Sequence, residues 1–65
     1  MMSHIMSEYL GRLIEQLQSQ SFREGELAQQ IATEGNTGVL VAQYKGTRET
    51  VNSLKDAIRA ILQTA

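Results

Sequence analysis

Gly38-Val39-Leu40-Val41-Ala42-Gln43-Tyr44-Lys45-Gly46-Thr47 is the stretch that decides the fold of this 65-residue chain. It has two interpretations. Residues 39–44 lie between glycines and include two β-branched valines, so they are compatible with a strand that turns at Lys45-Gly46 and pairs with residues 47–51. In the other interpretation the stretch begins a helix, and the chain is all-α.

The heptad pattern favours the helix. Counting onward from Leu40 in steps of four and three, the pattern is interrupted only by Thr47 and runs through Leu40, Tyr44, Thr47, Val51, Leu54, Ile58, Ile61 and Ala65. A lone two-stranded hairpin is marginal in water unless a helix covers it. We therefore predict a helix over about 38–64. An αββα arrangement and a shorter helix capped by Thr47 remain open as alternatives.

The first half of the chain carries a matching apolar stripe. Leu10, Leu17 and Ile31 share one heptad position, and Met6, Leu13 and Leu27 share the other. Gln20 and Glu24 interrupt both rows. Ser21 and Glu24 also match a helix-start signature, and Gly25 is unfavourable inside a helix by about 1 kcal/mol relative to alanine. A break at residues 19–25 is therefore open, but the register resumes without a proline, which predicts one helix over about 3–33.

The two periodic segments are separated by a turn-forming sequence, Glu34-Gly35-Asn36-Thr37-Gly38. A glycine just after a helix supplies its left-handed end, and Asn or Thr caps the helix that follows. The two helices have similar lengths, on the order of 40 to 45 Å at ~1.5 Å per residue, which suits an antiparallel hairpin. The sequence thus predicts one all-α domain over residues 1–65, with the turn at 34–38.

Size and composition favour self-association. A chain this short buries only roughly 60% of the surface that its unfolded form exposes. It has no cysteine and a single histidine, His4, so neither disulfides nor a zinc site supply stability. We expect copies to assemble into a homo-oligomeric bundle, a dimer or larger. The predicted core and oligomer interface comprises Leu10, Leu13, Leu17, Leu27, Ile31, Leu40, Val51, Leu54, Ile58 and Ile61.

The same composition argues against several functions. Net charge is −1, so no large positive field favours nucleic acid. No apolar run approaches the ~20 residues of a membrane span, and residues 1–6 do not resemble a signal peptide, so we expect a cytoplasmic protein. We find no catalytic, metal-binding or cofactor-binding residues and expect no enzyme activity. Glu8 and Arg12 have the spacing of a surface ion pair.

One group of residues could bind a polar ligand. Arg48, Asn52, Lys55 and Arg59 recur at intervals of four, three and four, so they share a helix face, and Tyr44 lies one turn before Arg48. This pattern is typical of a solvated surface, in which Asp56 offsets Arg59. It also fits an anion site for a phosphate, a nucleotide or an acidic protein patch, with Tyr44 stacking on a base.

Two short stretches, Gly11-Arg12-Leu13-Ile14-Glu15-Gln16-Leu17 and Arg59-Ala60-Ile61, resemble the helical hairpin of phage proteins that sequester cyclic-nucleotide immune signals. The resemblance covers these ten residues; the linking segment is longer and the chain has no tryptophan. It implies a small helical oligomer that binds its ligand between protomers, with Arg59 near a ligand phosphate.

The sequence therefore leads to two functional hypotheses. The first is a small homo-oligomeric interaction protein that acts on a protein partner as an adaptor, regulator or inhibitor. The alternative is a ligand sponge whose sites form between protomers around Arg48, Lys55 and Arg59. Nucleic-acid binding by the same face is a weaker possibility.

Overall fold

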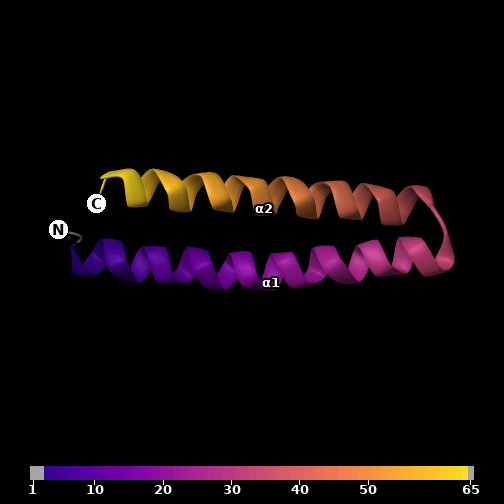
Figure 1. Cartoon of the computed structure of the whole chain (residues 1–65), viewed down its shortest axis with the longest axis horizontal. Helices are drawn as coiled ribbons and strands as arrows, with labels where there is room; N and C mark the ends of the chain where they lie inside the picture. Colours follow the sequence, from indigo (N-terminus) through magenta and orange to yellow (C-terminus); the bar gives the residue numbers. More distant parts are fainter. Residues whose placement is uncertain (1–2, 65) are drawn as a thin grey trace.

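The structure, a computed structural model, describes residues 3–64 and consists of two helices, α1 (His4–Glu34) and α2 (Gly38–Thr64), joined by residues 35–37. The helices lie antiparallel and side by side along a rod of 48 × 14 × 13 Å, with both chain ends at the same end of the rod (Figure 1). The predicted all-α helical hairpin is confirmed. Because the turn is centred near residue 36, residues whose numbers add to about 71 lie at the same level along the rod.

The stretch that decides the fold is helical throughout. Residues 39–51 lie inside α2, so the strand alternative is wrong, as is a second helix that begins at Thr47. Val39 is 68% exposed whereas Val51 is 3% exposed, a contrast that follows from the helical period. Thr47 is buried and its hydroxyl donates to the Gln43 carbonyl at 2.8 Å, so a polar residue is tolerated at this core position.

The first helix does not break. Ser21 and Glu24 lie inside α1, and Gly25 continues it. The reason is the register: Leu13 and Leu27 are two heptads apart, and both are buried against α2 only if the helix between them is continuous. Burial of Leu27, at 4% exposed, outweighs the modest penalty of a glycine.

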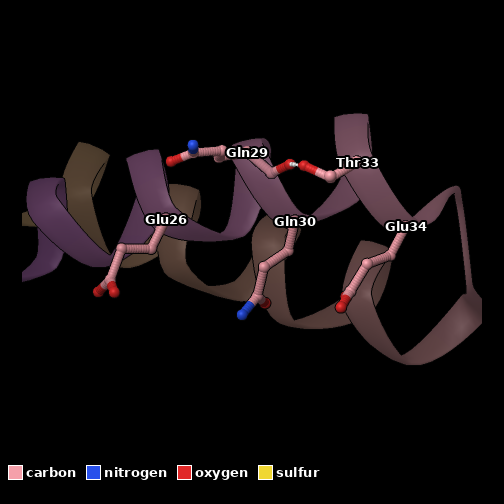
Figure 2. A pocket seen from close by; sticks show the side chains of 5 residues that line it. All are labelled: Glu26, Gln29, Gln30, Thr33 and Glu34. Atoms are coloured by element: carbon pink, nitrogen blue, oxygen red, sulfur yellow. Dashed lines mark hydrogen bonds between the residues drawn. The ribbon is translucent and has the colours of Figure 1, made fainter.

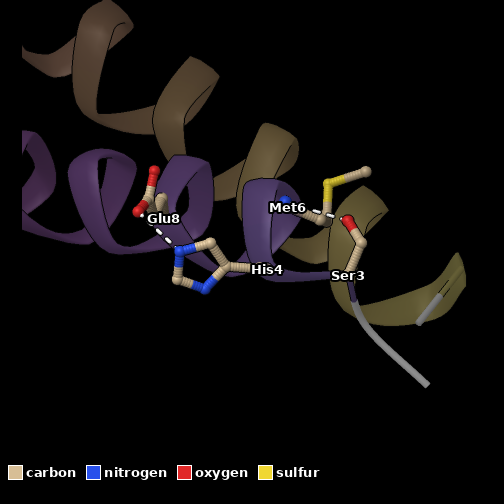
Figure 3. A network of polar contacts seen from close by, with 4 residues as sticks. All are labelled: Ser3, His4, Met6 and Glu8. Carbon is tan, nitrogen blue, oxygen red and sulfur yellow. Dashed lines mark hydrogen bonds and ion pairs between the residues drawn. The ribbon is translucent and has the colours of Figure 1, made fainter.

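The start of α1 is set by a side-chain cap. Ser3 has extended backbone, and its hydroxyl accepts a hydrogen bond from the Met6 amide at 3.1 Å (Figure 3). One turn further on, His4 Nε2 lies 3.0 Å from Glu8 Oε1. The expected ion pair between Glu8 and Arg12 is therefore wrong: the carboxylate turns toward the helix start, where exposed amides carry partial positive charge.

The turn is built by a glycine and a threonine. Gly35 has a φ of 95° and a ψ of 169°, and its amide donates to the Ile31 carbonyl at 2.9 Å, which ends α1. Thr37 then starts α2, because its hydroxyl accepts from the Leu40 amide at 3.2 Å. The capping role predicted for Asn or Thr falls to Thr37.

The core is a narrow apolar seam between the helices. Its buried apolar residues are Leu13, Leu27, Val51 and Leu54. Flanking them are half-buried residues from both helices, namely Leu10, Leu17, Ile31, Leu40, Ile58 and Ile61. Within residues 3–64 every side-chain hydrogen bond joins positions three or four apart. Apolar packing, and not cross-helix hydrogen bonding, therefore holds α1 against α2.

Polar residues interrupt the middle of this seam. Gln20 and Glu24 are half-buried on the side of α1 that carries Leu13 and Leu27. Glu24 is level with Thr47 on α2. The middle of the seam thus contains a polar layer, which we define as Gln20, Glu24 and Thr47, next to the buried Val51.

Replacing Gly35 with alanine should destabilise the hairpin by about 1–3 kcal/mol, because its backbone conformation is essentially restricted to glycine. Gly46→Ala is the matched control: a Cβ at either position meets no atom within 4 Å, but Gly46 lies inside α2 with ordinary helical backbone. We expect that control to stabilise the protein by up to about 1 kcal/mol. Urea unfolding followed by circular dichroism measures both, and equal effects would contradict this account of the turn.

Replacing Glu24 with leucine should raise the free energy of unfolding by on the order of 1 kcal/mol, since a half-buried charged side chain becomes apolar surface in the seam. The control is Glu26→Leu, which makes the same change at an exposed position of the same helix. It should shift stability by less than about 0.5 kcal/mol. Thermal unfolding of both variants tests this, and a destabilised Glu24→Leu protein would show that the carboxylate has a stabilising partner.

Candidate functional site

The residues predicted to bind an anion lie along one side of α2. Its cations Lys45, Arg48, Lys55 and Arg59 are all exposed and lie within a sector of the helix circumference, which we call the basic face. They are spread along the axis, however. Arg48 and Lys55 are seven residues apart, about 10 Å at ~1.5 Å per residue, so one phosphate does not span them within a single chain.

Lys55 and Arg59 are closer, one turn apart, but Arg59 has an acidic neighbour. Its Nη1 lies 3.8 Å from Asp56 Oδ1, and the two side chains are 68% and 77% exposed. An exposed pair of this length contributes at most a few tenths of a kcal/mol. Asp56 thus offsets some of the repulsion between Lys55 and Arg59 and leaves both heads accessible to solvent.

Tyr44 occupies a different position from the cations. It is half-buried and continues the heptad row of Val51 and Ile58, so it lies at the edge of the seam. The residue is therefore partly accessible to solvent one turn before Arg48. The structure therefore places Tyr44 beside the basic face and does not bring its ring together with Lys55 or Arg59.

Two shallow hollows lie elsewhere on the surface. One is on the last turns of α1, where Figure 2 shows two carboxylates and no cation; it is lined by Glu26, Gln29, Gln30, Thr33 and Glu34. The other lies where the helices meet and is lined by Glu15, Gln16, Ser19, Gln20, Thr50 and Leu54. Neither includes a residue of the basic face or Tyr44. Their acidic and amide linings do not suit an anionic ligand.

Large apolar side chains remain in contact with water. They are Ile5, Met6, Tyr9, Ile14, Phe22, Val39 and Leu62. Phe22 is 71% exposed and was missed by the sequence reasoning, because it lies outside the two heptad rows. That off-pattern position was itself the signal: an aromatic residue on the solvent side of an amphipathic helix has no role in the seam.

Metal binding and membrane insertion are the two remaining features that the described residues 3–64 bear on. No group of three or more histidine, aspartate or glutamate side chains there is arranged to hold a metal ion. Over the same residues, neither helix combines the length and the apolar character needed to cross a membrane.

The surface features that bear on function are thus the basic face of α2, which runs along one helix, and the exposed apolar side chains, most of which lie toward the chain ends. No protein-family model, no curated protein and no solved structure matches this chain.

Proposed function

We propose that this chain is a homo-oligomeric helical interaction protein, which assembles with copies of itself and presents a helix face to a protein partner as an adaptor, regulator or inhibitor. The observation that carries the proposal is the imbalance between buried and exposed apolar side chains. Among residues 3–64, four apolar residues are buried, whereas seven large ones are exposed. Scattered apolar residues are normal on a surface, but here the large exposed ones outnumber the fully buried ones.

The exposed area supports the same proposal. The chain exposes 4925 Å², whereas a compact monomer of 7.2 kDa exposes about 4100 Å². The excess is about 800 Å², close to what each partner buries in a stable protein–protein interface. Five of the exposed apolar residues, Ile5, Met6, Tyr9, Ile14 and Leu62, lie on the half of the rod that carries the chain ends. Assembly involving that half would cover part of this apolar surface.

A separate surface remains for another protein. Phe22 lies on the side of α1 away from α2, near the middle of the rod, and is flanked by the polar side chains of Gln18 and Glu26. Aromatic side chains surrounded by polar ones are enriched where proteins meet. Phe22 is therefore the residue on which we expect partner binding to centre.

The assembly is tested by light scattering after gel filtration at micromolar concentration. We expect a mass of at least twice 7.2 kDa for the unaltered chain. The double variant Ile14→Glu and Leu62→Glu should raise the concentration needed for assembly at least tenfold, about 1.4 kcal/mol, because it places charge on surface that copies cover. Phe22→Glu, a change at a more exposed apolar residue, is the control and should assemble normally.

Circular dichroism should show unchanged helix content in these variants, so that a loss of mass reports assembly and not unfolding. A monomeric unaltered chain would refute the proposal.

The basic face favours a second candidate function, a sponge for a small phosphate-bearing ligand such as a cyclic nucleotide. Within residues 3–64, Arg48 and Lys55 take part in no ion pair, so their charges are available. Because these cations are too far apart to converge within one chain, the ligand would lie between protomers, where cations from two copies meet.

This alternative is tested by calorimetric titration with a cyclic dinucleotide. Arg59→Gln should weaken binding by about ten- to hundredfold, since a hydrogen bond between charged groups is worth about 1.5–3 kcal/mol. Arg12→Gln, which removes the same charge from α1, should leave the affinity within about threefold. Equal losses in both variants would indicate binding to net charge alone, and an absence of heat with the unaltered chain would exclude the sponge.

A further inference from the structure

Charge is divided unequally between the two helices. With His4 neutral, α1 has five glutamates and two arginines, a net charge of −3, whereas α2 has four cations and two acids, a net charge of +2. When two copies associate, contacts between α1 and α1, or between α2 and α2, would bring like charges together. Contacts between α1 of one copy and α2 of the other bring opposite charges together.

The basic face lies on a definite side of the hairpin. The inter-helix hollow fixes the opposite side, because Gln16 and Gln20 of α1 line it together with Thr50 of α2. Arg48 is two residues before Thr50, about 200° around the helix, so it points to the other side of the hairpin. Ile14 is likewise two residues before Gln16. Arg48 and Ile14 therefore lie on the same side of the hairpin, away from the hollow.

On that side, α1 presents a row of uncharged residues. They occupy two adjacent heptad positions, the one that contains Ile14 and the one that contains Gly11. This uncharged face consists of Ser7, Gly11, Ile14, Gln18, Ser21, Gly25, Ala28 and Ala32. The charged residues Glu8 and Glu26 of α1 lie on the outer side of the helix beyond the row, and Glu15 lines the hollow on the opposite side.

The glycines of the uncharged face have no role inside the hairpin. Gly11 and Gly25 each disfavour the helix by about 1 kcal/mol relative to alanine, yet a Cβ at either position meets no atom within 4 Å. Small residues in such a row leave room for long side chains of a neighbouring helix, whose aliphatic stems cover the row while their charged heads reach past it. The lysine and arginine side chains of the basic face have such aliphatic stems and charged heads.

We propose that the partner of this side of the hairpin is a second copy of the chain, with the uncharged face of α1 in one copy packed against the basic face of α2 in the other. The proposal rests on the self-association argued above and adds its geometry. The two copies lie with their turns at the same end, so every helix has antiparallel neighbours, as in a four-helix bundle.

The levels of the charges agree with this arrangement. Because level residues add to about 71, Lys45 of one copy lies level with Glu26 of the other. This places a cation of the basic face level with a carboxylate on the outer side of α1. The contact occurs twice by symmetry, which multiplies the effect of individually weak charges.

The test is disulfide cross-linking. Because the chain has no cysteine, only the introduced cysteines can form disulfides. Ala28→Cys and Val41→Cys are made in separate chains, mixed, unfolded, refolded together and oxidised. Both positions lie near the turn and face the proposed contact, and since each chain has one cysteine, any mixed disulfide joins two copies. We expect the mixed disulfide to exceed either homodisulfide several-fold by mass spectrometry.

Each other outcome has a distinct meaning. Predominance of the Ala28→Cys homodisulfide would overturn the proposal in favour of α1 against α1, and a mixed product no more abundant than random pairing gives would overturn it as well. A single Phe22→Cys chain, substituted outside the contact, is the control and should not cross-link efficiently. If light scattering shows a monomer, the proposed function itself fails; an oligomer without the mixed disulfide refutes only this geometry.

Discussion

Apolar packing along one seam is the interaction on which the rest of the structure depends. Within residues 3–64 no side-chain hydrogen bond or ion pair connects α1 to α2, so the helices stay together because Leu13, Leu27, Val51 and Leu54 leave water. A seam with so few buried side chains is thin for a chain of this size. Because the seam buries few side chains, other apolar residues stay exposed and the chain has excess surface. These two properties are why association is central to the proposed function.

The ends of the helices determine how that seam is aligned. Gly35 ends α1 with a backbone conformation that other residues avoid, and Thr37 starts α2 two residues later. So short a connection leaves α2 little freedom to slide along α1. The basic face and the uncharged face consequently lie on the same side of the hairpin, where a second copy could contact both.

The fold was largely predictable from the sequence because a heptad pattern specifies both the helix and the side that it buries. The pattern was sufficient to choose helix over strand at residues 39–51 despite Val39 and Val41, and to continue α1 through Gly25. The local contact of Glu8 was not predictable, since Glu8 has a possible partner one turn away on either side and the sequence does not distinguish His4 from Arg12. The candidate site was only partly predictable: spacing places Arg48 and Lys55 on one face, but whether cations converge depends on neighbouring chains, which periodicity within one chain does not describe.

The polar layer of Gln20, Glu24 and Thr47 also bears on how the hairpin moves. It divides the seam into a half near the turn, held by Leu27, and a half near the chain ends, held by Leu13 and Leu54, while the buried Val51 lies level with Gln20. Separating the helices at the chain ends exposes little additional apolar surface once the opening has passed Val51 and lies between Glu24 and Thr47, whereas opening the turn half also works against a covalent connection. The layer is therefore a natural boundary between two cooperative units of unequal lifetime. The two helices would then separate from the chain ends as far as the midpoint of the rod while the turn half stays closed. The half that opens is the same half that exposes most of the large apolar side chains.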